Sequence, residues 1–426
     1  YLSVENLTKS FGERILFEDL TFGIDQGQKV AIVAKNGAGK TTLLRCLMDM
    51  EQYDSGRIVY RNDIRVAFME QTESLNPDQS ILEAVFDHDI PALQLIKTYN
   101  LAMATNDEDA LADCYQAITE MNAWDIEVKV QQILSVLKLD QTDQKIGSLS
   151  GGQKKRVALA KVLLSEADFL ILDEPTNHLD LDMIEWLESY LSASKSTLLM
   201  VTHDRYFLEV VCDTIFELSD RTIYKYKGNF SYYLEKKAER EEQLQSTVEK
   251  AKNTFRKELD WIRRQPKARG TKQKARVDAF DGIKATAQMR LDEDEMELPI
   301  KMERLGSKIV EFHKVSKSYD PKVILEDFSY HFQRKERLGI VGNNGTGKST
   351  FLNVLLRQLK PTEGSVELGT ELNIAYFDQL RDQLDPNKTL LENISGGSEF
   401  IDINGKQTHI LSYLRRYLFE PARARE

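Results

Sequence analysis

The chain has 426 residues, 41% of them hydrophobic and 29% charged, with a formal net charge of −11. This length predicts two or three domains, and the acidic balance excludes nucleic-acid binding over the whole surface, so any such contact must be local. We find no apolar run of the roughly 18–20 residues that cross a bilayer and no signal peptide, and the three cysteines are far apart, which is typical of a cytoplasmic protein.

The N-terminal segment predicts a phosphate-binding loop. Strand patterns at 2–7, 21–24 and 29–33 precede a glycine loop that runs directly into a helical pattern. Loop amides and the helix N-terminus can bind phosphates, with Lys40 reaching the β and γ groups and Thr41 holding Mg²⁺. Ala34 stands where the first glycine of the usual pattern would be, which suits the loop only if its φ is negative. The expected nucleotide contacts are Asn36, Gly37, Ala38, Gly39, Lys40, Thr41 and Thr42.

The stretch 149–204 predicts the rest of a nucleotide site. It opens with Leu-Ser-Gly-Gly-Gln, and an apolar run at 169–172 then ends in Asp173 and Glu174. After a second strand-like run comes His203. A buried strand that ends in two carboxylates can hold a metal with the first and polarise a water with the second. Two such acids alone could form a solvated turn, but the upstream phosphate loop favours the site. The intervening segments 92–103 and 126–139 have helical spacing and predict a helical insert.

A charged linker follows, from about 225 to 305. Residues 235–259 predict a solvent-exposed helix, and 261–276 contain seven basic residues and no acid. Pro266 and Gly270 place this basic segment near the tip of a helical hairpin, with a return helix at 279–291. A solvated charged face is the alternative, but a basic segment in an acidic chain favours contact with nucleic-acid phosphates through backbone and shape. The candidate contacts are Arg263, Arg264, Lys267, Arg269, Lys272, Lys274 and Arg276.

The chain contains an internal repeat at an offset of 308 residues without a gap. The repeat predicts a second phosphate loop, with Gly342 at the place of Ala34, and a second glutamine after a strand, Gln379, matching Gln71. The expected second-loop contacts are Asn344, Gly345, Thr346, Gly347, Lys348, Ser349 and Thr350.

The second copy is incomplete. Only 47 residues follow Gln379, and 394–398 (Ile-Ser-Gly-Gly-Ser) imitates the earlier Ser-Gly-Gly motif. That stretch begins too early, however, because its serine lies 16 residues after Gln379 whereas Ser150 lies 79 after Gln71. We interpret it as a loop and expect the second copy to be truncated.

Together these motifs resemble an ATP-binding cassette (ABC) ATPase, and two cassettes with a charged helical linker resemble the ABC-F family, its Uup-like branch in particular. The resemblance implies an α/β fold of tandem P-loop NTPase cassettes, each a mixed sheet with a helical subdomain. The expected domains are 1–224, the linker 225–305, and a partial cassette at 306–426.

The resemblance also implies roles. Phe11 and Tyr319 would stack on adenine, with a core aromatic as the alternative. Asp173 would position Mg²⁺, Glu174 would act as general base and His203 would contact the γ-phosphate. The other implied residues are Gln71, Gln379 and Ser349 near Mg²⁺, the signature Ser150, Gly151, Gly152 and Gln153 facing the opposite cassette, and Asp180 at the cassette–cassette seam.

The function expected from this resemblance is a cytoplasmic, nucleotide-switched translation factor that contacts the ribosome (rRNA or tRNA) through its linker. The ATP-binding subunit of a transporter and a DNA-maintenance ATPase are the alternatives. Because hydrolysis in this family needs a phosphate loop and a signature from opposite cassettes, we expect the 426-residue chain to bind Mg-ATP and to hydrolyse it weakly as a monomer. Self-association through the first cassette would raise its activity.

Overall fold

The computed structural model describes residues 1–12, 14–70, 75–87, 91–105, 107–121, 123–263, 284, 309–320, 322–369, 372, 374–377, 384–385, 387–403, 406–417, 419 and 424. The chain divides into two compact units, Tyr1–Leu244 and Gln245–Glu426. Each is described by itself. The domain limits expected at 224 and 305 stay predictions.

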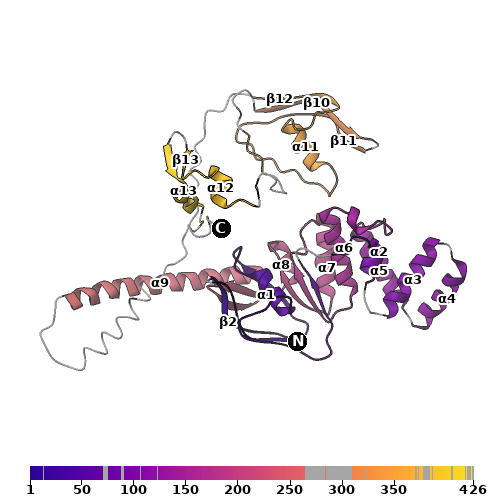
Figure 1. Cartoon of the computed structure of the whole chain (residues 1–426), viewed down its shortest axis with the longest axis horizontal. Helices are drawn as coiled ribbons and strands as arrows, with labels where there is room; N and C mark the ends of the chain where they lie inside the picture. Colours follow the sequence, from indigo (N-terminus) through magenta and orange to yellow (C-terminus); the bar gives the residue numbers. More distant parts are fainter. Residues whose placement is uncertain are drawn as a thin grey trace. The chain divides into compact units, whose positions relative to one another are not determined.

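The first unit is built on a six-stranded sheet with the order β5-β6-β7-β3-β8-β9. Figure 1 labels the helices of this unit. Its strands pair in parallel except the edge strand β9, which is antiparallel to β8. The sheet is therefore mixed, as predicted. The central strands are buried on both faces, which explains their nearly continuous apolar sequences. The strands are β3 (Lys29–Ala34), β5 (Val66–Met69), β6 (Phe169–Asp173), β7 (Thr197–Val201), β8 (Thr214–Ser219) and β9 (Thr222–Lys227).

A second, antiparallel sheet has the order β2-β1-β4. It consists of β1 (Leu2–Phe11), β2 (Arg14–Ile24) and β4 (Ser55–Tyr60). Apolar residues from this sheet, from helix α1 (Lys40–Leu47) and from β3, β6, β7 and β8 share one buried cluster. This core fixes the start of α1 beside the carboxyl ends of the parallel strands, where ligands bind in open α/β sheets.

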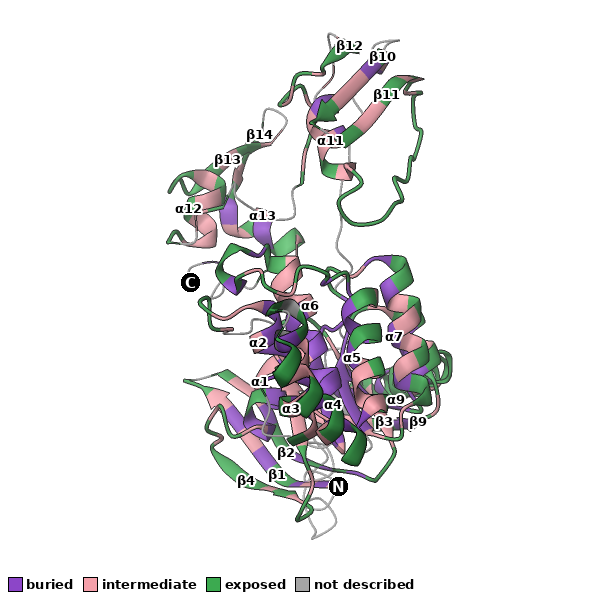
Figure 2. Ribbon diagram, turned by 90° about the vertical axis from the view of Figure 1, so that its right-hand side faces the viewer, coloured by how far each residue is buried: buried purple, intermediate pink, exposed green. Residues whose placement is uncertain are grey.

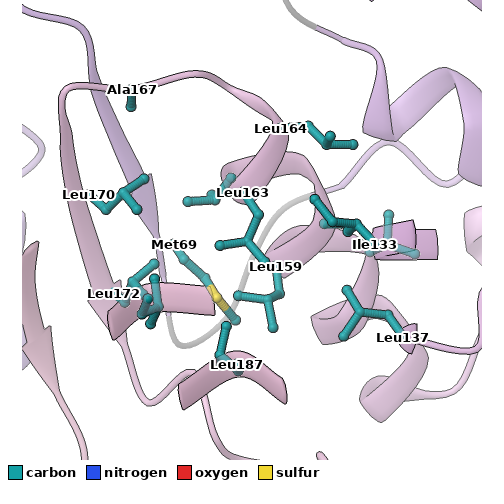
Figure 3. Close-up of a cluster of buried hydrophobic side chains, with 14 of the residues drawn as sticks. Met69, Ile133, Leu137, Leu159, Leu163, Leu164, Ala167, Leu170, Leu172 and Leu187 are labelled. Atoms are coloured by element: carbon teal, nitrogen blue, oxygen red, sulfur yellow. The ribbon is translucent and has the colours of Figure 1, made fainter. Parts of the chain in front are cut away.

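The other core of the first unit lies between the large sheet and its helices (Figure 3). Leu159 and Leu163 of helix α6 lie near Met69 of β5 and Leu172 of β6, while Ile133 of α5 extends the same cluster. The helices here are α2 (Ile81–Val85), α3 (Pro91–Thr105), α4 (Glu108–Glu120), α5 (Trp124–Val136) and α6 (Gly151–Leu164), with a 3-10 turn at Ile146–Ser148. The predicted helical insert is confirmed, although α4 was missed, and α3 and α4 keep much exposed surface (Figure 2).

Three further helices follow the signature helix. They are α7 (Leu181–Ala193), α8 (Arg205–Val211) and α9 (Phe230–Arg263). The predicted exposed linker helix is confirmed as α9, which begins earlier than expected. The return helix expected at 279–291 lies outside the described residues, apart from Lys284.

The second unit repeats the antiparallel sheet of the first in the order β11-β10-β12, followed by helix α11. The register is the same in both copies, because Glu311 pairs with His331 as Ser3 pairs with Gly23. The elements are β10 (Val310–Tyr319), β11 (Lys322–His331), α11 (Lys348–Leu355), β12 (Glu363–Leu368), α12 (Leu390–Ser395), β13 (Phe400–Ile403), β14 (Lys406–His409) and α13 (Ile410–Arg416).

One part of the repeat differs between the units. Residues 338–341 correspond to β3 but are not in a strand, and Val341 is largely exposed. In the first unit β3 pairs with β7 and β8, and the described part of the second unit offers no counterpart of either strand. A central strand needs neighbouring strands as partners for its backbone groups, which explains why 338–341 are not in a strand here. Across the described ranges, none of the helices combines the length and apolar character needed to cross a membrane.

Candidate nucleotide site

The phosphate loop of the first unit connects β3 to α1. Gly37 and Gly39 have φ values of 75° and 98°, a region that favours glycine. Ala34 ends β3 and is not among the residues with positive φ. The alanine at the place of the usual first glycine is therefore compatible with the loop.

Lys40 begins α1 and lies folded back over the loop. Its Nζ atom donates a hydrogen bond to the Ala34 carbonyl oxygen at 3.0 Å. Burial lowers the pKa of Lys40, and the carboxylates of Glu174 and Asp173 oppose this shift. The ammonium group is thus held near both carboxylates and beside the positive end of α1, where phosphate groups bind.

Asp173 ends the buried strand β6 and is only 1% exposed. The Thr41 hydroxyl donates a hydrogen bond to this carboxylate, but burial dominates and raises the pKa of Asp173. Its Oδ2 atom has no hydrogen-bond partner within the described part of the chain. A buried carboxylate oxygen without a hydrogen-bond partner, next to a threonine hydroxyl, is the kind of oxygen ligand that Mg²⁺ prefers.

Glu174 has a strained backbone and faces His203. Its φ is 53°, a left-handed conformation that is uncommon for residues with a side chain. Its amide donates to the Val201 carbonyl oxygen at 2.8 Å, which fixes the turn after β6 against the end of β7. The Nε2 atom of His203 lies 3.6 Å from the Glu174 Oε1 atom. Burial raises the pKa of Glu174, while His203 opposes the rise.

The signature begins helix α6. Ser150 is the N-cap residue, and it forms a reciprocal capping box with Gln153. A side chain at Gly151 would meet nothing within 4 Å, whereas a Cβ atom at Gly152 would lie 3.4 Å from His178. The helix start is therefore open at Gly151 and closely packed at Gly152.

Lys155, on the same helix, is a site residue that the sequence reasoning missed. Burial lowers its pKa, and Glu174 and Asp173 are the charges that oppose this shift. A lysine five residues after a serine N-cap carries no special signal in the sequence. Its place beside the carboxylates follows from the packing of α6 against the end of β6.

Asp180 is buried and engaged inside the first unit. It caps α7 by accepting from the Met183 amide, and its Oδ2 atom lies 2.6 Å from the Lys138 Nζ atom. Its role at a cassette–cassette seam stays a prediction.

Phe11 and Tyr319, the aromatic residues expected to stack on adenine, are not core residues. Each is about half exposed, at 50% and 49%. The Nζ atoms of Lys9 and Lys317 lie over their rings at 4.5 and 5.2 Å. Both rings are accessible to a planar ligand.

The second loop repeats the first contact by contact. The Nζ atom of Lys348 donates to the carbonyl oxygens of Gly342 and Asn343 at 2.6 and 2.7 Å. The Lys322 ammonium group donates to the Gly345 carbonyl oxygen, as Arg14 does to that of Gly37. Gly345 and Gly347 have positive φ like their counterparts. The second loop is therefore folded.

The stretch 394–398, interpreted as a loop, is a helix end followed by a turn, and it does not have the geometry of a signature. Ser395 ends α12, and Gly396 is its left-handed C-cap residue. Ser150, by contrast, begins a helix. Gly396 therefore stops a helix at the point where a signature would start one.

Several predicted site residues lie outside the residues that the structure describes. Gln71 and Gln379 are among them, as are the basic residues from Arg264 to Arg276. Arg263 ends α9, but its side chain is not described.

Comparison with known proteins agrees with this geometry. A family model described as ABC transporter matches residues 17–177 and 325–425, and a second model with the same description matches 216–300. The uncharacterized ABC transporter ATP-binding protein YfmR of Bacillus subtilis is 35% identical over 98% of this chain and 68% of its own length.

Two further relatives are similar over the same extent. The energy-dependent translational throttle protein EttA of Mycobacterium tuberculosis is 33% identical, covering 98% of this chain and 76% of its own length. The ATP-binding protein Uup of Escherichia coli is 34% identical, covering 99% and 68%. With two phosphate loops, one signature and this extent of similarity, the chain belongs to the ABC-F family of ATP-binding cassette proteins.

Proposed function

We propose that this protein hydrolyses ATP with the help of Mg²⁺ and that its nucleotide state controls its association with the ribosome. The observation that carries the proposal is the group formed by Lys40, Asp173, Glu174 and His203 at the carboxyl ends of β6 and β7. A cation for phosphate, an acid for metal and a base paired with histidine are the parts that phosphoryl transfer to water needs.

Each of these residues has a distinct task. Asp173 and Thr41 would hold Mg²⁺. When bound, the ion would neutralise part of the phosphate charge. Glu174 accepts the proton of the attacking water, and His203 orients that carboxylate and contacts the γ-phosphate. Gln71 would complete this site, and Ser349 and Gln379 would take the metal-binding positions of the second cassette.

Two observations support the proposed association with the ribosome. One relative is named a translational throttle protein, and the basic segment from Arg263 to Arg276 interrupts an acidic chain. Phosphate neutralisation is the plainest use for such a segment. The seven basic residues would contact rRNA or tRNA backbone, in the cytoplasm.

Hydrolysis by these 426 residues depends on pairing. They contain one signature, at Ser150, and in this family a signature acts on the nucleotide of an opposite cassette. Two copies that associate through their first cassettes would place Ser150 of one copy at the phosphate loop of the other. ATP turnover by this chain is therefore expected to be weak when dilute and to rise with protein concentration.

The proposal is tested with Glu174→Gln, a change that keeps the size of the side chain but removes the base. With ATP, this variant should remain bound to ribosomes during sucrose-gradient sedimentation, whereas the wild type, incubated at a protein concentration that supports turnover, should dissociate after hydrolysis. The control is the double variant Lys40→Ala/Lys348→Ala, which should sediment with ribosomes no more than wild type with ADP.

A second variant tests the linker separately. Reversing Arg263, Arg264, Lys267 and Lys272 to glutamate should weaken ribosome binding and flatten its salt dependence while ATP affinity is unchanged. If Glu174→Gln binds ATP but does not sediment with ribosomes in any nucleotide state, the ribosome proposal is wrong. Retention on DNA alone would support a DNA-maintenance role instead.

A further inference from the structure

The outer face of the antiparallel sheet in the second unit carries two histidines and two glutamates side by side. Glu311 and His313 lie on β10, His331 ends β11, and Glu367 lies on β12. Glu311 is directly opposite His331 on one side and Glu367 on the other. Residues two apart on a strand share a face, and opposed residues on antiparallel strands have Cβ atoms about 5 Å apart. The register therefore gathers all four side chains.

The side-chain atoms of three of these residues lie mutually close, and His331 lies beside Glu311. One ligand atom each from Glu311, His313 and Glu367 lies within 4.8 Å of the others. The His313 Nε2 atom is 3.4 Å from the Glu311 Oε2 atom, and the His331 Nδ1 atom is 3.9 Å from the Glu311 Oε1 atom. The two imidazole rings have centroids 5.6 Å apart. Three hydrogen-bonded strands hold these groups, so their spacing is set by the sheet.

The first unit shows that the fold itself does not require this group. The residues at the same register positions there are Ser3, Glu5, Gly23 and Val59. That sheet forms with the same pairing and without any histidine on this face.

We propose that Glu311, His313, His331 and Glu367 form a binding site for a divalent transition metal, and specifically for Zn²⁺. Two imidazole nitrogens and two carboxylate oxygens match the donor types and number of a four-coordinate zinc site. Mg²⁺ and Ca²⁺ prefer oxygen ligands alone, so this donor set selects against them. In the described residues Glu311, His313 and Glu367 are the one group of at least three histidine, cysteine or acidic side chains close enough to share an ion. His331 lies beside this group, within 3.9 Å of Glu311, and would supply the fourth ligand.

The three cysteines are poorly placed to compete for zinc. Cys46, Cys114 and Cys212 are all buried in the first unit. Burial raises the pKa of the Cys46 thiol to about 11, which disfavours the thiolate that binds metal.

The test is a zinc titration of the whole 426-residue chain, free of tags and nucleotide, against a chromophoric zinc chelator. The wild type should remove one equivalent of Zn²⁺ from the chelator. The variants His313→Asn and His331→Asn should each weaken that binding by about 100-fold or more, because each removes a ligand rather than an outer partner. Zinc should also raise the melting temperature of the wild type, and this rise should be lost in both variants.

The matched control is His409→Asn. His409 is an exposed histidine in the same unit whose Nδ1 atom caps α13, a task that asparagine can perform. It should bind zinc like the wild type. Zinc K-edge absorption should show two imidazole ligands in the wild type and one in each single variant.

Two results would overturn the proposal. One is a wild-type chain that takes no zinc from the chelator. The other is a loss of zinc in His409→Asn as large as in His313→Asn, which would assign the ion to scattered surface histidines. Circular dichroism of each variant checks that the sheet is retained, and Glu367→Gln gives an independent variant that keeps both imidazoles.

Discussion

The Nη2 atom of Arg240 on helix α9 lies 2.8 Å from the Oε2 atom of Glu217 on strand β8. Glu217 is buried, and the Lys237 Nζ atom lies 2.8 Å from its other carboxylate oxygen. The Tyr226 hydroxyl donates to Glu217 at 3.2 Å, and the Arg240 guanidinium lies 3.9 Å above the Tyr224 ring. Since β8 pairs with β3, one carboxylate joins the start of the linker helix to the neighbour of the phosphate-loop strand.

Removing this carboxylate should therefore destabilise the first unit. Glu217→Ala leaves two cations without their shared partner, and we expect a loss of about 2–3 kcal/mol in the free energy of unfolding. Lys236→Ala is the control, because Lys236 pairs with Glu239 at the surface of the same helix and should cost at most about 0.5 kcal/mol. Urea unfolding followed by tryptophan fluorescence measures both. Equal losses would mean that the Glu217 group does not anchor the helix.

The two site residues Lys40 and Glu174 should have separable effects. Lys40→Ala removes the cation over the first loop and should weaken ATP binding there by about tenfold or more, while Glu174→Gln should leave binding unchanged and slow hydrolysis by about 100-fold or more. Fluorescent ATP binding and phosphate release measure the two properties. The binding assay requires Lys348→Ala as a background, because we expect the second loop to bind nucleotide as well. Wild-type turnover by Glu174→Gln would refute its role as the base.

The raised pKa values of Asp173 and Glu174 predict how stability depends on pH. Both carboxyl groups are buried, so the folded state favours their protonated forms. Their contribution to stability is present below the ordinary carboxyl pKa and is lost as pH rises through the raised folded values. Asp173→Asn should therefore raise the melting temperature of the nucleotide-free chain at pH 7.5, by roughly 2–4 °C. The gain should vanish near pH 4. A gain of the same size at both values would contradict this account.

The same shift predicts the pH profile of hydrolysis. Glu174 accepts a proton only when it is ionised, so turnover should rise with pH through a value above that of an ordinary glutamate. Turnover of the wild type between pH 4.5 and 8 tests this. An acid limb at or below the ordinary glutamate range would show that burial does not control the base.

Positions 34 and 39 of the first loop should differ sharply in their need for glycine. Gly39 has φ 98°, so Gly39→Ala should strain the loop and weaken ATP binding by about tenfold or more. Ala34→Gly should change binding less than about twofold, since no positive φ is needed there. Both are compared by ATP titration in the Lys348→Ala background. A large gain from Ala34→Gly would show that the alanine impairs the loop.

Much of the nucleotide site could be predicted because its residues follow strands with clear patterns. The apolar run of β6 located Asp173, and the strand–loop–helix order located Lys40. The gapless repeat also predicted the second loop, because one register requires one backbone path. The rejection of 394–398 as a signature rested on its spacing and on the lack of a following basic helix and Asp-Glu strand. Gly396 agrees with it by ending a helix.

The remaining features depend on tertiary packing, which local sequence does not encode. The positive φ of Glu174 arises where β6 meets β7, and nothing in its neighbours indicates it. Lys155 and Glu217 become important through contacts with distant elements. Helix α4 was missed although its sequence is amphipathic, and only Cys114 and Ile118 of it are buried.

The pairing of Ala34 with Gly342 bears on how such loops are recognised. A side chain at Gly342 would place its Cβ atom 3.1 Å from the Thr346 Oγ1 atom, and Ala38 stands at that position in the first loop. The alanine at 34 is thus accommodated because no hydroxyl group stands four residues later. The two positions differ together within one polypeptide, since Ala34 occurs with Ala38 and Gly342 with Thr346. The first loop therefore keeps the phosphate-loop backbone without its first glycine, because its two later glycines have the same positive φ as their counterparts in the second loop.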